Sequence, residues 1–389
     1  MYNIRTYNAI SEKGLSRFPA DKYAVSPEAA LPEGVLLRSQ KLQSEVLPES
    51  VIAVARAGAG TNNIPTENYT EQGIVVFNTP GANANAVKEL IVAGLLLGSR
   101  DIYGGMTYVQ ELGHMDDSGE MGKLLEKEKK RFAGSEITGK TLGVVGLGAI
   151  GSIIANLALD LGMNVIGYDP AISVEAAWQL SSQVERMDSI ESLLARADFI
   201  TLHVPAIAAT KHLINKDTLA LMKSTAKILN FAREEIVSTD DMVTALDNGV
   251  IAGYISDFPA PALLGRKDVL LMPHIGASTE EAEENCAVMA ADQLMDFLEN
   301  GNIRNSVNYP PTKMTRNGGS RITFTNNNVP KVLGSVLAVL ADAELNVVDM
   351  VNKSRGDIAY NIIDLKGDLD STIEAAIAAV EGVVRVRVI

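Results

Sequence analysis

Three residues able to act on a hydroxy acid each stand within two positions of the end of a predicted strand. They are Arg233 after strand 226–231, Asp257 after strand 250–256 and His274 after strand 269–272. The planar guanidinium of an arginine binds a carboxylate through two parallel hydrogen bonds. A histidine exchanges a proton near neutral pH, which suits removal of a hydroxyl proton. Because the carboxyl ends of parallel strands meet at one sheet edge, this placement brings together a candidate carboxylate clamp and a candidate base, the two groups that oxidation of a 2-hydroxy acid requires.

A second histidine competes for the role of proton acceptor. His203 ends the predicted strand 198–203, so it reaches the same sheet edge as His274. Spacing alone does not rank the two, and a structural role is the default for either. His114 and His212 have no comparable placement.

A glycine motif places a dinucleotide beside these residues. The predicted strand 142–146 leads into Gly146, Gly148 and Gly151, which have the G-x-G-x-x-G spacing, and a helical pattern follows. Gly146 permits the turn, Gly148 lets a pyrophosphate approach the backbone, and Gly151 lets the helix pack closely on the strand. The first turn of that helix offers unpaired N–H groups to the phosphates.

The end of the next predicted strand, 164–168, indicates which dinucleotide binds. Asp169 follows this strand, 23 positions after Gly146. A carboxylate at this place accepts hydrogen bonds from both ribose hydroxyls of NAD and repels the 2′-phosphate of NADP. No lysine or arginine occurs in 170–173, so we predict NAD as the cofactor.

An anion site is predicted in the N-terminal part of the chain. Arg38 follows the apolar run 35–37, and Arg56 follows the apolar run 51–55 and precedes a glycine-rich turn. A further strand is followed by a polar loop that carries Asn83. Two arginines placed directly after apolar strands favour an anion-binding site at the strand ends.

Composition narrows the class of protein. The chain has 389 residues, enough for two or three domains, and its formal net charge of −14 argues against nucleic acids and anionic membranes as partners. The single cysteine, Cys286, excludes an internal disulfide framework and fits a reducing cytoplasm. The best apolar run, 90–97, is too short to span a bilayer, no signal peptide is visible, and we expect no metal site.

The predicted elements form three successive groups. Strands are predicted at 2–7, 35–39, 51–55 and 74–77, then a helix at 86–100, then strands at 142–146, 164–168, 198–203, 226–231, 250–256 and 269–272, mostly separated by helices. In the segment 101–139, the charge run 126–131 indicates a solvated helix face. The helix 278–299 returns the chain to the first group, and the segment 307–319, rich in Pro, Asn and Gly, is predicted to be a linker. A βαββαβ order in 320–388 then predicts a small ferredoxin-like domain.

Five motifs resemble those of the D-isomer-specific 2-hydroxyacid dehydrogenases, in the same order. They are Arg56-Ala-Gly-Ala-Gly-Thr-Asn62, Asn78-Thr-Pro-Gly-Ala-Asn83, the glycine motif 146–151, Asn230-Phe-Ala-Arg233 and Pro273-His274-Ile-Gly-Ala-Ser-Thr279. Near the C-terminus, Arg321-Ile-Thr-Phe-Thr and Val329-Pro330-Lys-Val-Leu-Gly resemble an ACT domain. The resemblance covers almost the whole chain and corresponds to a short form of the family with a C-terminal ACT domain.

The resemblance implies an α/β protein built around a doubly wound, Rossmann-type NAD domain. This domain would span 93–278, and a flavodoxin-like substrate domain would be split between 1–92 and 279–310. Residues 318–389 would form a ferredoxin-like ACT domain with a regulatory role. A homodimer or homotetramer is implied as well, with the apolar helix 86–100 as one contact.

The resemblance also implies roles for individual residues. Arg233 would hold the substrate carboxylate, and His274 would be the catalytic acid and base. Substrate contacts are implied for Arg38, Ser39, Arg56, Gly58 and Asn83. Cofactor contacts are implied for Gly146, Gly148, Ala149, Ile150, Gly151, Asp169, His203, Val204, Pro205, Thr210, Ala232, Asp257, His274 and Gly276. In the ACT domain, Asn326, Asn328 and Asn346 match positions that bind L-serine in related enzymes.

Three departures from the family pattern affect these implications. The loop Asp257-Phe-Pro-Ala-Pro261 is shortened and lacks the glutamate that usually pairs with the catalytic histidine, which leaves the imidazolium less stabilised and its orientation less fixed. Glu234 follows Arg233 where the family has glycine. In the ACT domain, Asn326 stands where histidine is usual, and Lys331 replaces a glycine.

The combination implies NAD-dependent oxidation of D-3-phosphoglycerate to 3-phosphohydroxypyruvate, the first step of L-serine synthesis. Arg38, Arg56 and the ACT domain favour this phosphorylated substrate. Reduction of another 2-oxo acid, such as hydroxypyruvate or glyoxylate, is the second enzymatic hypothesis. A non-catalytic, NAD-sensing scaffold is the hypothesis from another class, and the missing glutamate is its only support.

Overall fold

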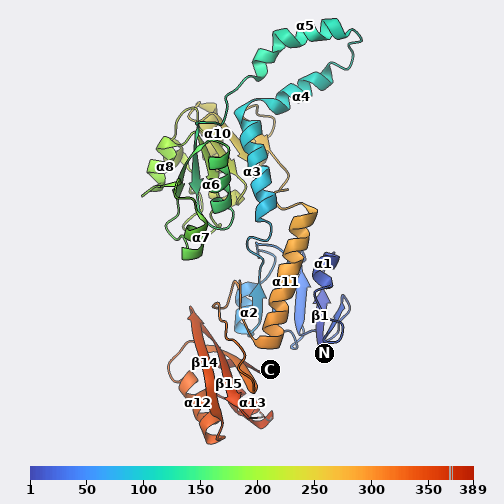
Figure 1. Ribbon diagram of the computed structural model, residues 1–389, viewed down its shortest axis with the longest axis vertical. Helices are drawn as coiled ribbons and strands as arrows, with labels where there is room; N and C mark the ends of the chain where they lie inside the picture. Colours follow the sequence, from blue (N-terminus) through green and yellow to red (C-terminus); the bar gives the residue numbers. More distant parts are fainter. Residues whose placement is uncertain (368, 370) are drawn as a thin grey trace. The chain divides into compact units, whose positions relative to one another are not determined.

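The computed structural model describes residues 1–367, 369 and 371–389, and the chain divides into two compact units (Figure 1). Unit 1 comprises Met1–Asn83 and Thr279–Ile389, and unit 2 comprises Ala84–Ser278. The first boundary falls after residue 83 instead of residue 92, because the helix that begins at Ala84 packs on the sheet of unit 2. In the part of the chain that is described, no helix is both long and apolar enough to cross a membrane.

Unit 1 contains a five-stranded parallel sheet in the order β2-β1-β3-β4-β5. Its strands are β1 (Tyr2–Thr6), β2 (Tyr23–Ser26), β3 (Gly34–Leu37), β4 (Ala53–Arg56) and β5 (Val75–Phe77), and its short helices are α1 (Glu12–Leu15) and α2 (Thr66–Glu71). This strand order is the flavodoxin-like one, which confirms the predicted fold of this region. The sequence pattern did not predict β2, a four-residue strand at the sheet edge.

The long helix α11 (Glu280–Asn300) belongs to the same unit, as the predicted helix 278–299 suggested. The hydroxyl of Thr279 caps its first turn by accepting the N–H of Ala282, and Gly301 ends it in the left-handed region at φ 70°. Its buried face packs on α1 and on β3, β4 and β5. The helix therefore joins the C-terminal half of the chain to the N-terminal sheet.

Unit 2 contains a seven-stranded parallel sheet in the order β12-β11-β10-β9-β6-β7-β8. Its strands are β6 (Thr141–Val145), β7 (Asn164–Tyr168), β8 (Glu185–Arg186), β9 (Phe199–Leu202), β10 (Lys227–Asn230), β11 (Gly253–Ser256) and β12 (Val269–Leu271). The strand order reverses between β6 and β9, so the predicted Rossmann-type fold is confirmed. Six strands were predicted, and β8, with two exposed residues, was not.

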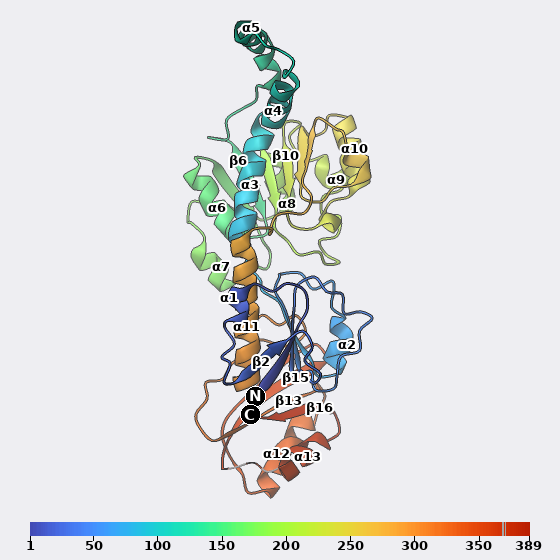
Figure 2. The same cartoon turned by 90° about the vertical axis from the view of Figure 1, so that its right-hand side faces the viewer.

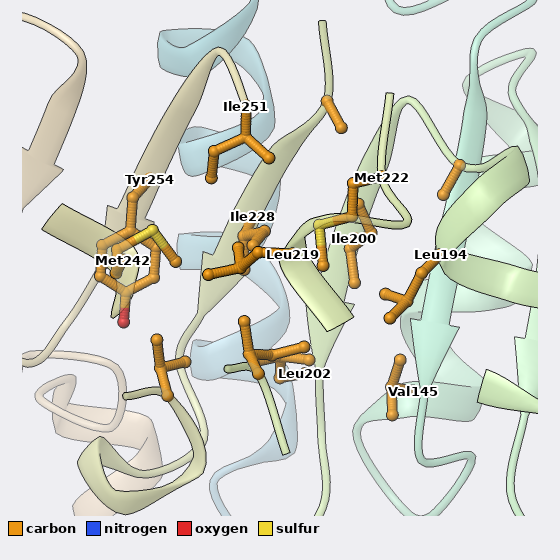
Figure 3. Close-up of a cluster of buried hydrophobic side chains, with 14 of the residues drawn as sticks. Val145, Leu194, Ile200, Leu202, Leu219, Met222, Ile228, Met242, Ile251 and Tyr254 are labelled. Carbon is orange, nitrogen blue, oxygen red and sulfur yellow. The ribbon is translucent and has the colours of Figure 1, made fainter. Parts of the chain in front are cut away.

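Helices cover both faces of the seven-stranded sheet (Figure 2). They are α3 (Ala84–Ser99), α6 (Gly151–Asp160), α7 (Val174–Gln179), α8 (Ile190–Arg196), α9 (Lys216–Leu219) and α10 (Thr239–Asp247). Helices α3 and α6 pack with Val144 and Leu229, whereas α8, α9 and α10 pack with Val145 and Ile228 (Figure 3). Neighbouring residues of one strand thus serve opposite cores, as the two-residue period of a strand requires.

The apolar face of α3 is used inside unit 2. Val87, Ile91 and Leu95 are buried in the core shared with the sheet. A Cβ atom on Gly94 would stand 3.0 Å from the ring of Phe231, so the helix lies directly on β10 and its continuation. The apolar pattern of 86–100 is therefore explained by packing within the chain and gives no support to a subunit contact.

The segment after α3 forms a helical arm. It consists of α4 (Ile102–Glu111), α5 (Ser118–Glu128) and the 3-10 turn η1 (Lys129–Phe132) (Figure 1). No residue of α4 or α5 is buried. Tyr103 and Met106 are 65% and 64% exposed, so this arm presents apolar side chains that have little cover from their own chain.

The C-terminal part of unit 1 is a four-stranded antiparallel sheet in the order β14-β15-β13-β16. Its elements are β13 (Ser320–Asn327), α12 (Val332–Asp342), β14 (Asn346–Arg355), β15 (Ile358–Lys366), α13 (Ser371–Ala378) and β16 (Val383–Val388). Both helices pack on one sheet face, which confirms the ferredoxin-like prediction. The predicted start of the second helix, residue 370, lies outside the described residues.

The prediction of a linker at 307–319 is wrong. Asn308, Tyr309 and Met314 are buried, and the hydroxyl of Tyr309 donates to the carbonyl oxygen of Thr70 at 3.0 Å. The ring of Tyr309 also lies 6.2 Å, between centroids, from that of Tyr360 in β15. This segment therefore belongs to a core that the four-stranded sheet shares with the rest of unit 1.

Two arginines join the four-stranded sheet to the end of α11. Arg321, fully buried, pairs with Asp364 at 2.6 Å and donates to the carbonyl oxygen of Asn300 at 2.8 Å. Arg387 donates to two further carbonyl oxygens of the last turn, and its guanidinium lies 4.8 Å above the ring of Phe297. The carbonyl oxygen of Phe297 also accepts the N–H of Gly301, whereas the arginines supply donors to the carbonyl groups of Leu298 and Asn300, which lie in the last turn, where carbonyl groups lack intrahelical partners.

Candidate active site

The predicted site residues are divided between the two units, and each set is held by its own sheet. Arg233, Asp257, His274 and the glycine motif belong to unit 2. The predicted anion-binding residues, from Arg38 to Asn83, belong to unit 1.

The glycine turn of unit 2 has the geometry that a pyrophosphate requires. Gly146 has φ +90°, and a Cβ atom there would stand 2.8 Å from the carbonyl carbon of His203. A Cβ atom on Gly148 would meet no atom within 4 Å, so the backbone there is open to a ligand. A Cβ atom on Gly151 would lie 1.9 Å from the carbonyl oxygen of Gly146, so a side chain would push the start of α6 away from the turn. Ala149 and Ile150 complete this turn.

Asp169 follows β7 beside the same turn. Its Oδ2 accepts the N–H of Leu147 at 2.8 Å, and its Oδ1 accepts the N–H of Ala171 at 2.9 Å. The carboxylate therefore helps to shape the glycine turn, a role that the spacing argument did not include. An ionised carboxylate accepts about four hydrogen bonds, so capacity remains for ribose hydroxyls. These residues fit a dinucleotide without a 2′-phosphate.

His203 is engaged by its neighbours at the end of β9. Its Nε2 lies 2.9 Å from the hydroxyl oxygen of Thr201, and its backbone N–H donates to the carbonyl oxygen of Val145 at 2.7 Å. Desolvation lowers the pKa of His203 to about 3, so its imidazole is neutral at physiological pH. Val204 and Pro205 continue from it, and Thr210 closes their loop by donating to the carbonyl oxygen of Pro205.

His274 stands in a different environment three residues after β12. It is exposed, and its backbone has φ +57°, a left-handed conformation that is uncommon for residues other than glycine. Asp257, 1% exposed, holds the residues that follow: Oδ1 accepts the N–H of Ile275 at 2.8 Å, and Oδ2 accepts the N–H of Gly276 at 2.7 Å. The ring of Phe258 lies 4.9 Å from the imidazole, between centroids. Asp257 thus positions the histidine loop, in addition to the cofactor contact that the family implies.

Arg233 is presented by a turn at the end of β10. The side chain of Asn230, fully buried, donates to the carbonyl oxygen of Arg233 at 2.9 Å and accepts the N–H of Ala232 at 3.2 Å. The guanidinium donates one hydrogen bond, to the carbonyl oxygen of Ala232 at 2.6 Å. Arginine has five N–H donors, so a fork for a carboxylate remains. Glu234 is exposed in the following 3-10 turn.

The two arginines predicted to bind an anion, Arg38 and Arg56, are engaged in different ways. Arg56 donates to the carbonyl oxygens of Arg38, at 2.9 Å, and Gly60, so it shapes the strand-end loops. Arg38 pairs through its guanidinium with Oε1 of Glu283 at 2.7 Å. Glu283 lies in the first turn of α11, and its pairing with Arg38 was not predicted because the two residues are far apart in sequence.

Other predicted substrate residues lie on loops that these contacts build. The N–H of Ser39 donates to Oδ1 of Asn8 at 2.9 Å, and Asn8 has φ +65°. The carbonyl oxygen of Gly58 accepts the N–H of Thr79 at 3.1 Å. In the described part of the chain, Oδ1 of Asn83 is buried without a hydrogen-bond partner. Such an acceptor is costly to bury and is therefore a candidate ligand contact.

The three predicted serine-binding asparagines differ in availability. Asn326 is 3% exposed, and its Oδ1 accepts a hydrogen bond from Asn361 at 2.7 Å while its amide donates to the carbonyl oxygen of Asn327. This buried pairing argues against Asn326 as a ligand contact. Asn328 and Asn346 are exposed, and Asn328 also donates to the carbonyl oxygen of Gly356 at 3.0 Å.

Comparison with known proteins agrees with this geometry. Residues 105–276 match the family model described as D-isomer specific 2-hydroxyacid dehydrogenase, NAD binding domain. A D-3-phosphoglycerate dehydrogenase of Escherichia coli K12 is 31% identical over 88% of this chain and 82% of its own length. One of Synechocystis sp. is 39% identical over 72% of this chain, and this chain spans about half (49%) of its length. One of Methanocaldococcus jannaschii is 35% identical, and this chain spans 58% of its length.

Solved structures show the same relationship. An NAD+-bound 3-phosphoglycerate dehydrogenase of Entamoeba histolytica has a TM-score of 0.61 and 26% identity, covering 81% of this chain and 99% of that one. The glycine turn, the strand-end residues and these similarities agree, and the chain belongs to the D-isomer specific 2-hydroxyacid dehydrogenase family.

Proposed function

We propose that this protein oxidises D-3-phosphoglycerate to 3-phosphohydroxypyruvate with NAD+, the first step of L-serine biosynthesis. The observation that carries the proposal is the sheet edge of unit 2, where strand ends bear Arg233 and His274 and where the glycine turn with Asp169 fits NAD. Several relatives at 30–39% identity bear the name D-3-phosphoglycerate dehydrogenase, which supports D-3-phosphoglycerate as the substrate of this protein. The single cysteine suits a reducing compartment, so we propose the cytoplasm as its location.

Each residue has a distinct part in this chemistry. NAD+, when bound, supplies the acceptor for the hydride that leaves C2 of the substrate. Arg233 binds the carboxylate next to C2 with its guanidinium fork. His274 accepts the hydroxyl proton as general base, because it is the exposed one of the two strand-end histidines, whereas His203 is bonded to Thr201 and resists protonation. Arg38 is the candidate of unit 1 for the phosphate, since Arg56 holds loop carbonyl groups.

Turnover of D-3-phosphoglycerate with NAD+, measured by NADH absorbance, tests the proposal. Hydroxypyruvate and glyoxylate with NADH serve as comparison substrates, and we expect the highest kcat/KM with the phosphorylated substrate. His274→Ala should lower kcat by roughly 10²–10⁴-fold while NAD+ affinity, measured by calorimetry, stays near that of the wild type. A protein that binds NAD+ but turns over none of these substrates would be a cofactor-binding scaffold instead.

We propose further that the four-stranded C-terminal domain binds L-serine as a feedback ligand. Asn328 and Asn346 are exposed and supply amide donors and acceptors that suit a zwitterion. Calorimetry with L-serine should use the full chain, because the sheet shares a core with the rest of unit 1. Asn346→Ala should abolish the heat of binding, whereas D-serine should bind weakly to the wild type. Absence of heat with L-serine would remove the regulatory role.

We propose a dimer through the helical arm rather than through α3. Arm residues such as Tyr103, Met106 and Phe132 line an apolar hollow of about 660 Å³. Apolar side chains that have little cover from their own chain favour a second copy of the arm as partner. Met106→Asp should yield monomers by size-exclusion chromatography with light scattering. The control Val46→Asp, at a residue that is 97% exposed in unit 1, should leave the oligomeric state unchanged.

A further inference from the structure

We propose that Phe258 is a positioning residue that orients the imidazole of His274 in place of the glutamate that this chain lacks. The inference rests on the proposed role of His274 as general base. It concerns the shortened loop after β11, where two consecutive residues, Asp257 and Phe258, both contact the histidine segment.

The contact between the two rings is specific in geometry. Their centroids lie 4.9 Å apart, and the ring planes are inclined by 57°. Tilted aromatic pairs with centroids about 4.5–7 Å apart are a favoured arrangement. Such a contact restricts the ring of His274 to one orientation without supplying a charge.

The Phe258 ring is itself fixed by its backbone. The N–H of Phe258 donates to Oγ of Ser256 at 3.0 Å, and Ser256 is fully buried at the end of β11. The next residues are Pro259 and a second proline at 261, whose rings limit backbone rotation. The aromatic side chain therefore projects from a short, braced loop.

Asp257 supplies the complementary restraint on the backbone of the histidine. Its two carboxylate oxygens hold the N–H groups of Ile275 and Gly276, so they stabilise the left-handed conformation of His274. Asp257 thus fixes the backbone from which the imidazole extends, and Phe258 fixes the orientation of the imidazole ring. Among residues 1–367, 369 and 371–389, the structure shows no hydrogen bond or ion pair to the imidazole, which leaves the aromatic contact as its restraint.

This arrangement differs in chemistry from a histidine–carboxylate pair. A glutamate would both orient the ring and stabilise its charged form, whereas a phenyl ring in this position orients it without an anionic partner. The ring should therefore influence the rate of proton and hydride transfer but leave the binding of NAD+ unchanged. The test therefore compares the effect of a substitution on kcat with its effect on the KM for NAD+.

Phe258→Leu and Phe258→Tyr test the role of the ring. The leucine variant should lower kcat by about 10-fold or more, since loss of orientation at a reacting group has effects of up to 10²-fold. KM for NAD+ should stay constant, and the isotope effect with substrate deuterated at C2 should increase as chemistry becomes rate-limiting. The tyrosine variant keeps the ring and should retain kcat within about 3-fold. Leu264→Ala, at a residue that is 63% exposed beyond the same loop, is the matched control and should match the wild type.

A double-mutant cycle identifies the route of the effect. In a His274→Ala background, Phe258→Leu should cause no further loss, because the ring acts through the imidazole. An undiminished kcat in Phe258→Leu, or equal losses with and without His274, would overturn the inference. Should the leucine variant fold poorly by circular dichroism, Phe258→Met, which keeps the volume without the ring, decides on the same criteria. Normal turnover in His274→Ala alone would instead refute the proposed function of the histidine.

Discussion

In unit 2, Arg233 donates one hydrogen bond to a neighbouring carbonyl group, and His274 stands exposed beside a phenyl ring. In unit 1, by contrast, Arg56 donates to two loop carbonyl groups, and Arg38 is paired with Glu283. Both sets of residues lie at or just after the ends of parallel strands, so their positions relative to the strands are similar. The difference lies in what surrounds each side chain after folding.

This contrast separates groups available to a substrate from groups already engaged. The available groups of unit 2 are held in place by two buried neighbours, Asn230 and Asp257. The side chains of these residues form hydrogen bonds with backbone groups of the loops that carry Arg233 and His274. In the proposed role, Arg38 of unit 1 would exchange the carboxylate of Glu283 for the substrate anion. Three substitutions test the contrast, in decreasing order of expected effect.

Arg233→Ala should have the largest effect, because it removes the positive charge proposed to bind the substrate carboxylate, and the neighbouring residues 230–236 carry no other cation. We expect kcat/KM for D-3-phosphoglycerate to fall by about 10²-fold or more, since loss of a charged partner in a site costs 2–5 kcal/mol. NAD+ affinity should be largely kept. Steady-state kinetics and calorimetry measure the two quantities, and an unchanged kcat/KM would exclude Arg233 from the site.

Glu283→Gln should have a smaller effect of opposite sign. The variant releases Arg38 from an ion pair whose side chains are about 40% exposed, and such pairs contribute about 1 kcal/mol at most. KM for D-3-phosphoglycerate should therefore fall by up to about 5-fold, with kcat unchanged. Glu284→Gln is the matched control, because Glu284 pairs with Lys13 instead. A higher KM in Glu283→Gln would show that the glutamate orients Arg38 for the substrate.

The sequence was sufficient to predict the three sheets, because most of their strands and helices have strong apolar patterns and alternate along the chain. It missed β2 and β8, whose four and two residues are too few to produce such a pattern. The linker prediction failed because composition does not reveal that Asn308 bonds to the backbone of β5 and that Tyr309 enters a core. Contacts between residues distant in sequence decide these cases.

The same reason limits prediction of the site. Strand ends located Arg56, Arg233, His203 and His274, but sequence spacing does not tell whether a guanidinium meets a ligand or a loop carbonyl. The glycine motif was predictable in detail, because the absence of a side chain is what permits φ +90° at Gly146 and the close approach at Gly151. Asn326 was assigned by resemblance, yet Asn361, 35 positions away, occupies its amide oxygen.

His203 offers the smallest and last test, because it compares an engaged histidine with the available one. Its pKa is lowered to about 3 in the folded protein, whereas an unfolded histidine has a pKa near 6.5. Between these values the unfolded chain binds a proton that the folded chain does not, so the free energy of unfolding decreases as the pH falls. The contribution is at most about 1.4 kcal/mol per pH unit, and partial exposure of the residue reduces it.

His203→Gln removes this titration while keeping a polar group near Thr201. Urea unfolding of the variant and the wild type at pH 7, 6 and 5, followed by circular dichroism, should give a shallower loss of stability with falling pH in the variant. All other titrating groups are shared by the two proteins, so the difference isolates the histidine. Equal slopes would mean that His203 titrates normally in the folded state. The assignment of the proton transfer to His274 rather than His203 would then rest on mutational kinetics alone.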